Sequence, residues 1–133
     1  MLIKKIEFPI LGDERGSLIA LENSKNIPFD VKRVYYIFGS KKDIRRGFHA
    51  HHKTNQLAIC VSGSCSFLMD DGKQVENLTM NSKNIGLLIP PMVWHEMFDF
   101  SEDCILLVLA DSLYDEADYI RSYQEFTKLT QKL

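Results

Sequence analysis

Three histidines in two separate segments are the residues of this chain best suited to proton-transfer chemistry. His49 and His51 lie within residues 47–52 (GFHAHH), and His95 comes much later in the chain. Imidazole, with an ordinary pKa near 6.5, can both accept and donate a proton near neutral pH. Because residues two apart share one face of a strand, His49 and His51 are predicted to point the same way and His52 the other way.

The alternative for each histidine taken singly is a surface or core residue with no chemical role. The grouping of three favours a site, provided that the chain folds back to bring His95 beside the other two. Short strand-like segments separated by turn residues supply that return, and we expect strands at 2–8, 18–21, 31–38, 57–61, 65–69, 74–80, 86–89, 94–98 and 104–109. Strands of this length and spacing predict an all-β sandwich or a closed barrel.

The segment 31–38 (VKRVYYIF) is predicted to form a strand that is covered on both faces. Its β-branched and aromatic residues are typical of a covered strand. Alternation places Arg33, Tyr35 and Ile37 on one face and the next residues on the other, so only one of the two tyrosines shares a face with Arg33.

Two further segments are predicted to differ from this pattern. Residues 11–17 (LGDERGS) have the composition of a turn or loop, with glycines on both sides of Arg15. Residues 115–129 place Ile120, Tyr123, Phe126 and Leu129 at helical spacing, which predicts a short C-terminal helix that docks on the sheets.

Composition limits the classes of function. At 133 residues the chain fits a single domain, residues 1–133, and a net charge of −2 gives no reason for binding nucleic acid or an anionic membrane. The three cysteines are odd in number and lie in apolar contexts, so we expect reduced, buried thiols. No segment is long and apolar enough for a signal peptide or a membrane span, and we expect a cytoplasmic protein.

Two short motifs resemble those of the cupins, which are double-stranded β-helix (jelly-roll) proteins. The first comprises residues 47–51 with Gln56 and Gly63, and the second comprises Gly86, Pro90-Pro91 and His95. In metal-binding cupins a glutamate is found where this chain has Gln56. A neutral amide is a poorer ligand for a divalent ion than a carboxylate, so we expect no metal and no other cofactor.

A closer resemblance covers residues 5 to 127. Its segments occur in order at 13–17, 32–38, 46–51, 91–97 and 113–121. Together they are similar to the sugar-nucleotide 3,4-ketoisomerases (dTDP-4-oxo-6-deoxyglucose 3,4-oxoisomerases, WxcM-like). This resemblance implies a metal-independent cupin that acts on a dTDP-linked 4-keto-6-deoxy sugar, forms a homodimer and supplies amino-deoxy sugars for surface glycans.

Moving the ketone from C4 to C3 requires loss of the C3 proton, an enediol(ate), and return of a proton to C4. We hypothesise that His49 is the general base, that His51 shuttles the second proton or polarises the ketone, and that Tyr35 donates a hydrogen bond to the developing oxyanion. Whether the product has the galacto or the gluco configuration stays open, with overall likeness favouring galacto.

The remaining candidates would bind the substrate. Arg15 is the first choice for the diphosphate, by resemblance to a motif shared with 3,5-epimerases, with Arg33 and Arg46 as weaker candidates. Stacking on thymine is assigned to Trp94 or Tyr119, and His95 is expected to contact sugar or phosphate.

Three alternatives stay open at this point. The chain could be a metal-dependent small cupin, a sugar-nucleotide-binding module without activity, or an enzyme like the dTDP-sugar 3,5-epimerases.

Overall fold

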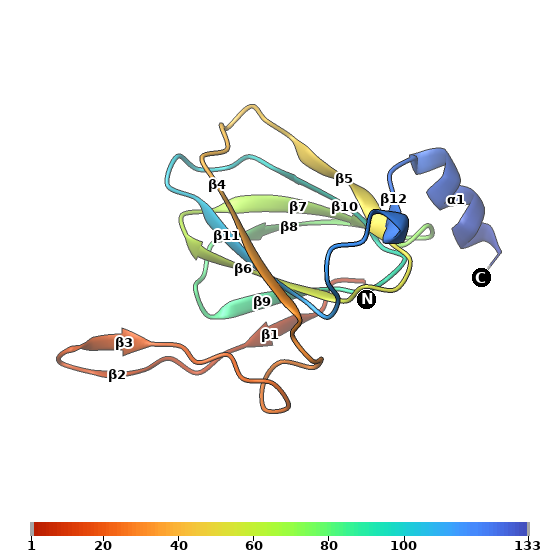
Figure 1. The fold of residues 1–133 in the computed structure, drawn as a ribbon. Helices are drawn as coiled ribbons and strands as arrows, with labels where there is room; N and C mark the ends of the chain where they lie inside the picture. The colour runs from red at the N-terminus through yellow and green to blue at the C-terminus, as the bar shows by residue number, and fades with distance from the viewer. Residues whose placement is uncertain (1, 133) are drawn as a thin grey trace.

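The computed structural model describes residues 2–132, which form two five-stranded antiparallel sheets, a two-stranded hairpin and a short C-terminal helix (Figure 1). One sheet has the strand order β1-β9-β6-β11-β4 and the other β12-β5-β10-β7-β8. The elements are β1 (Lys5–Glu7), β2 (Leu11–Asp13), β3 (Gly16–Leu18), β4 (Arg33–Phe38), β5 (Arg46–His51), β6 (Gln56–Ser62), β7 (Cys65–Asp70), β8 (Val75–Met80), β9 (Ile85–Ile89), β10 (Trp94–Phe98), β11 (Ile105–Ala110), η1 (Glu116–Asp118), β12 (Tyr119–Ile120) and α1 (Tyr123–Gln131). The expected jelly roll with a C-terminal helix is confirmed.

The main core lies between the two sheets. Alternate residues of each strand point inward, so that Ala58 and Leu106 of one sheet meet Phe67 and Met69 of the other, all four fully buried. Burying each of the larger side chains contributes on the order of 2 kcal/mol. This packed layer closes the interior on one side of the histidine site.

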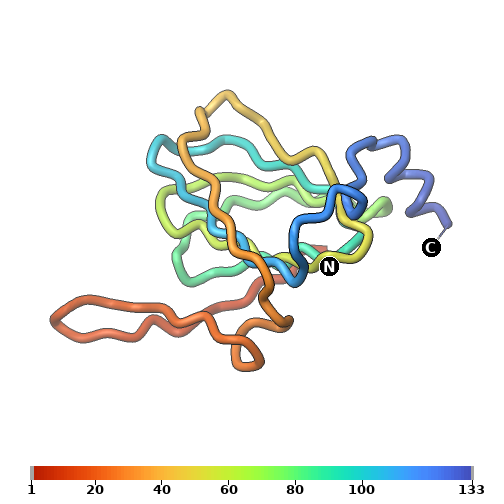
Figure 2. Tube along the Cα trace, in the orientation of Figure 1, coloured from red at the N-terminus to blue at the C-terminus, as the bar shows by residue number. Residues whose placement is uncertain are grey.

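Residues 11–18 form a hairpin with a turn at residues 14–15, whereas a turn or loop was expected over 11–17. The strand expected at 18–21 is not formed, since β3 ends at Leu18. Leu11 pairs with Leu18 and Asp13 with Gly16, whose φ of 131° favours glycine. The hairpin extends away from the two sheets (Figures 1 and 2). Ile10, Leu11 and Leu18 are each more than half exposed, at 57%, 53% and 58%. Its apolar side chains therefore have little cover from their own chain.

The C-terminal helix begins later than the sequence pattern predicted. Ser122 caps α1 by accepting a hydrogen bond from the backbone N–H of Glu125, and the preceding residues form the 3₁₀ turn η1 and the short strand β12. The reason is pairing, because Tyr119 lies opposite His51 and Ile120 opposite Ala50 on the edge of β5. Neither η1 nor α1, the helices within residues 2–132, has the length and apolarity needed to cross a membrane.

Candidate active site

Neighbouring strands bring the three predicted histidines together. β5 pairs with β10, and His49 lies directly opposite His95. The ring centroid of His49 is 4.5 Å from that of His95 and 5.1 Å from that of His51. His52 is exposed, as the strand alternation predicts. The fold thus supplies the chain reversal on which the grouping depended.

Gly47 allows the close approach of β5 and β10 at this point. Its φ is 98°, and a Cβ atom there would lie 2.9 Å from the carbonyl oxygen of His95. The register between the strands shifts at the same place, between His95 and Glu96. A side chain at position 47 would push the strands apart, because both the backbone angle and the space favour glycine.

Hydrogen bonds fix which ring nitrogen carries the proton in two of the histidines. The Nδ1 atom of His49 lies 2.9 Å from the carbonyl oxygen of Gly47, and that of His95 lies 3.2 Å from the carbonyl oxygen of Val93. Since a carbonyl oxygen can only accept, each Nδ1 donates a proton. The Nε2 atom of each neutral ring is then an unprotonated acceptor.

His51 is held by a carboxylate instead. Its Nδ1 atom lies 3.1 Å from Oδ2 of Asp118, and the side chains of both residues are almost completely buried, at 2% and 3% exposure. Asp118 also accepts hydrogen bonds from the backbone N–H of Lys53 and the hydroxyl of Thr54. The Nε2 atom of His51 is buried and has no hydrogen-bond partner among the described residues. Its lone pair is therefore not used by any described residue.

Burial keeps these histidines neutral. It is the main cause that lowers the pKa of His49 to about 4 and that of His95 to about 3. Burial also lowers the pKa of His51, against the opposing hydrogen bond and negative charge of Asp118. Although burial alone would raise the pKa of Asp118, its hydrogen bonds from Thr54, Lys53 and His51 lower it. A neutral imidazole beside a carboxylate is competent to accept a proton.

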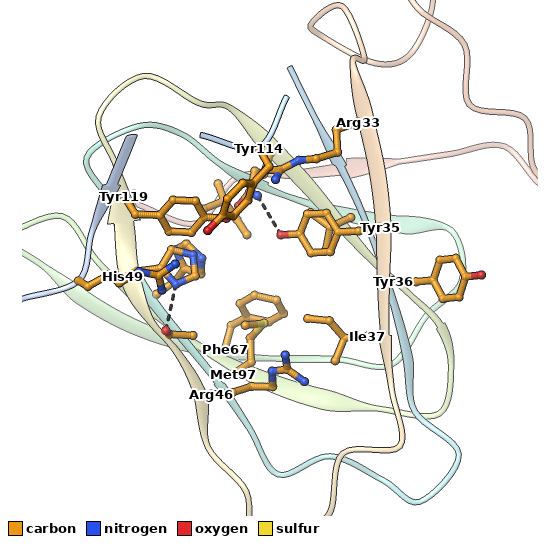
Figure 3. Close-up of a pocket in the computed structure, with 16 residues that line it drawn as sticks. Arg33, Tyr35, Tyr36, Ile37, Arg46, His49, Phe67, Met97, Tyr114 and Tyr119 are labelled. Carbon is orange, nitrogen blue, oxygen red and sulfur yellow. Dashed lines mark hydrogen bonds between the residues drawn. The ribbon is translucent and has the colours of Figure 1, made fainter. Parts of the chain in front are cut away.

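Tyr35 faces the histidines from β4, and Figure 3 shows Tyr36 pointing away from the pocket. The hydroxyl oxygen of Tyr35 accepts a hydrogen bond from Nε2 of Gln56 at 2.9 Å. Burial raises the pKa of Tyr35 to about 12, so the phenol is protonated at neutral pH. Because Gln56 occupies the acceptor side of this oxygen, the hydroxyl proton is free to be donated elsewhere.

The pocket between these residues has a volume of about 510 Å³, within the range of ligand sites. Three arginines line it, namely Arg33, Arg46 and Arg121. The Nε atom of Arg33 is buried with no hydrogen-bond partner among the described residues. Guanidinium groups suit a diphosphate because they offer paired donors in one plane. The walls thus combine neutral bases with a cationic rim.

Tyr119 lies between the histidines and Arg121, one of the arginines that line the pocket. Its ring centroid lies 4.9 Å from that of His49 and 4.4 Å from that of His51, and the guanidinium of Arg121 lies 4.3 Å from it. Figure 3 shows Tyr119 and Tyr114 at the same side of the pocket. Tyr119, one of the two residues expected to stack on thymine, therefore lies in the pocket.

Trp94 and Arg15 are not brought to the pocket. Trp94 is 3% exposed and packs with Tyr123 and Phe126 behind the histidine strand, because β10 alternation turns it away from His95. Its indole N–H donates to Glu96. Arg15 lies on the projecting hairpin, with a side chain 86% exposed and paired with Asp13 at 2.6 Å. Neither residue contacts the pocket of its own chain.

Four polar residues of this site were not named from the sequence as site residues: Asp118, Gln56, Tyr114 and Arg121. Gln56 was noted only as a departure from a metal ligand. Asp118 and its neighbours fall in the segment predicted to be helical, where nothing in the local pattern pointed to His51. The pairing of β12 with β5 in the folded structure is what places Asp118 and its neighbours beside His51.

Comparison with known proteins identifies the class of this site. The family model described as FdtA: WxcM-like, C-terminal, matches residues 1–131. The TDP-4-oxo-6-deoxy-alpha-D-glucose-3,4-oxoisomerase of Aneurinibacillus thermoaerophilus is 52% identical over 130 residues, which cover 98% of this chain and 94% of that protein.

Solved structures agree with this assignment. A mutant of the 3,4-ketoisomerase QdtA from Thermoanaerobacterium thermosaccharolyticum, in complex with TDP-4-keto-6-deoxyglucose, matches with a TM-score of 0.95 and 43% identity, covering 98% of this chain and 95% of that chain. A 3,4-ketoisomerase from Helicobacter canadensis matches with a TM-score of 0.94 and 46% identity, covering 98% of each chain. The chain therefore belongs to the FdtA family (WxcM-like, C-terminal) of sugar 3,4-ketoisomerases.

Proposed function

We propose that this chain, as a single cupin domain, moves the ketone of a TDP-linked 4-keto-6-deoxyglucose from C4 to C3. The observation that carries the proposal is the ring of neutral imidazoles, each with an Nε2 lone pair, facing the protonated phenol of Tyr35. The names of the relatives say that they act on or bind this class of molecule. The QdtA protein whose structure contains the keto sugar is a histidine-to-asparagine mutant.

The chemistry needs one base, one acid and one group that donates a hydrogen bond to the oxyanion. Nε2 of His49 takes the proton from C3, and the C3–H bonding electrons form the C3–C4 double bond of the enediolate. Tyr35 donates a hydrogen bond to the oxygen that becomes negative, which is typically worth about 10²–10³-fold in rate. Nε2 of His51 takes the proton of the C3 hydroxyl, and Asp118 stabilises the imidazolium that forms. This proton then returns to C4 as the oxygen on C3 becomes the new ketone, and the proton held by His49 passes to the oxygen on C4, which becomes a hydroxyl.

Substrate binding falls to the cationic and aromatic walls. Arg33 and Arg46 line the space where a diphosphate would neutralise them, and Arg121, which is paired with Glu116 at 2.7 Å, adds further N–H donors. Tyr119 offers a ring face to sugar or base. His95 lies opposite His49 and is buried, so its Nε2 is placed to accept a hydrogen bond from a sugar hydroxyl. No metal or organic cofactor is required by this proton transfer.

Arg15 fits the proposal only if a second copy of the chain is present. β4 is the last strand of its sheet, and its outward residues Val34, Tyr36 and Phe38 are 55%, 62% and 67% exposed. An open edge with apolar side chains favours association. We propose a homodimer in which this face and the hairpin are covered, so that Arg15 reaches the diphosphate bound by the partner subunit.

We expect the enzyme to work in the cytoplasm, where thiols stay reduced.

Incubation with TDP-4-keto-6-deoxyglucose in deuterated water tests the activity directly. NMR should show the ketone relocated to C3 and deuterium at the carbon that receives the returning proton, and it would also identify the galacto or gluco configuration at C4. Deuterium at C5 with the ketone unmoved would instead support an epimerase. An unchanged spectrum with clear binding of TDP would leave only a binding module.

The dimer has its own test. Phe38→Glu on the outward face of β4 should convert the protein to a monomer in light scattering coupled to size exclusion. Val75→Glu is the matched control, because Val75 is 57% exposed on β8, the last strand of the other sheet. A monomeric wild-type protein would overturn the dimer without affecting the proposed reaction.

A further inference from the structure

Three cysteines far apart in the sequence meet inside the jelly roll. Cys60 lies in β6, Cys65 begins β7, and Cys104 immediately precedes β11. Their Sγ atoms all lie within 4.8 Å of one another, and those of Cys60 and Cys104 are 3.8 Å apart. The three residues are 1%, 0% and 4% exposed. The sequence predicted reduced, buried thiols but not their convergence.

Two turns hold the thiols in place. The backbone N–H of Ser64 donates to Oγ of Ser101 at 2.9 Å, and the backbone N–H of Ser101 donates to the carbonyl oxygen of Ser64 at 2.9 Å. The N–H of Cys104 donates to the carbonyl oxygen of Ser101 at 3.1 Å. A side chain at Gly63 would collide with Ser101 and Asp103. The thiols are therefore fixed by the backbone before any ligand arrives.

This cluster is separate from the histidine pocket. β6 carries Gln56 in the pocket at its first residue and Cys60 four residues further along the same face. At about 3.3 Å per residue the two positions are roughly 13 Å apart. Ala58 lies between them on the same face of β6 and is fully buried, as is Leu106, which pairs with Cys60. A ligand at the cysteines would not contact the sugar site.

The spacing of the sulfur atoms suits a metal ion. A zinc–sulfur bond is about 2.3 Å long, so thiolates that share one ion lie close to 4 Å apart. Thiolates select Zn(II) and Cu(I) over harder cations. The carboxylate of Asp103 lies at the turn beside the cluster and adds negative charge.

We propose that Cys60, Cys65 and Cys104 form a binding site for one thiophilic metal ion, of the class of Zn(II) or Cu(I). Each thiol that becomes a ligand releases its proton to solvent, and no electron is transferred. The ion ties β6, β7 and the start of β11 together, so its effect is on stability rather than on the isomerisation.

Titration of the reduced, wild-type protein with Cd(II) tests this site without any substitution. Cadmium should bind one ion per chain, give an ultraviolet thiolate-to-metal charge-transfer band, release protons and raise Tm. Competition with Zn(II) and with Cu(I) then shows which of the two cellular ions displaces cadmium. Absence of the band at stoichiometric cadmium would overturn the proposal.

Variants locate the signal. Cys65→Ser and Cys104→Ser should each weaken cadmium binding by at least about 100-fold, since even second-shell changes cost 10–100-fold. His49→Asn is the control, because it removes an imidazole from the other possible metal-binding group and should leave the band unchanged. A band that survives in a variant with Cys60, Cys65 and Cys104 all replaced by serine, or that disappears in His49→Asn, would place the ion elsewhere. The wild-type titration stands even if a serine variant fails to fold.

Discussion

Nδ1 of His51 lies 3.1 Å from Oδ2 of Asp118, and both side chains are buried although 67 residues separate them in sequence. The pair sets the tautomer of the imidazole, so that the buried Nε2 is the unprotonated acceptor. It also gives a proton on His51 a compensating negative charge at the moment of transfer. The arrangement is the one expected of an imidazole that alternates between base and acid.

Asp118→Asn tests this pair. The amide can donate to Nδ1, which favours the tautomer with the proton on Nε2, so we expect kcat to fall on the order of 10²-fold or more. Replacing Oδ2 by an N–H donor also removes the acceptor of the Thr54 hydroxyl, which should cost about 1–3 kcal/mol of stability, whereas Oδ1 can still accept from Lys53. Asp111→Asn is the matched control, because Asp111 caps Asn55 outside the pocket. Unchanged kcat in a folded Asp118→Asn protein would contradict the role.

His49→Asn should remove the base that acts at C3. Turnover should fall about 10²–10⁴-fold, and exchange of the C3 proton with deuterated water should fall in parallel. His52→Asn, the neighbouring exposed histidine on the opposite face of the strand, should retain wild-type turnover. If His49→Asn still exchanged C3 at the wild-type rate, the base would have to be another residue.

Tyr35→Phe should lower kcat about 10²–10³-fold with a smaller change in KM, because its hydrogen bond strengthens as the oxyanion forms. The substitution also leaves the side chain of Gln56 without its partner. Tyr36→Phe, on the same strand but pointing outward, provides the control. Equal kinetics for the two variants would remove Tyr35 from the mechanism.

Arg33→Gln should weaken binding of TDP, measured by calorimetry, by roughly 10–100-fold, since a charged hydrogen bond is worth about 1.5–3 kcal/mol. Arg121→Gln should act in the same direction from the other wall. Arg45→Gln is the control, because Arg45 pairs with Glu96 at 2.7 Å and is not a pocket residue. Tight TDP binding by Arg33→Gln would show that its guanidinium serves another part of the substrate.

Stability should fall in acid through the buried histidines. Burial lowers the pKa of His49 to about 4, whereas the unfolded chain takes up the proton near pH 6.5. Between these values the unfolded state binds more protons, so stability decreases as pH falls through this window, by up to about 3 kcal/mol for His49. Thermal unfolding of the wild-type protein and of His49→Asn between pH 7 and pH 4 measures this loss of stability. If the stability of the two proteins depended on pH in the same way, His49 would not be the source of the loss.

The sequence by itself determined the fold class and the faces of the strands. Alternation on 31–38 separated Tyr35 from Tyr36, and the spacing of His49 and His51 put both rings on one face, because a strand repeats every two residues whatever surrounds it. Short strands between turn residues predicted an all-β sandwich or barrel, and the resemblance of two motifs to those of the cupins implied the jelly roll. These are local properties, and local propensity decided them.

Only the tertiary structure decided which residues meet across long separations. The pairing of β12 with β5 placed Asp118 against His51 and delayed the start of the helix to Tyr123. Packing against α1 buried Trp94 away from the pocket, and the free hairpin carried Arg15 away from its own chain's site. Strand register and the docking of a helix depend on the whole buried surface, so no pattern within one segment could predict them.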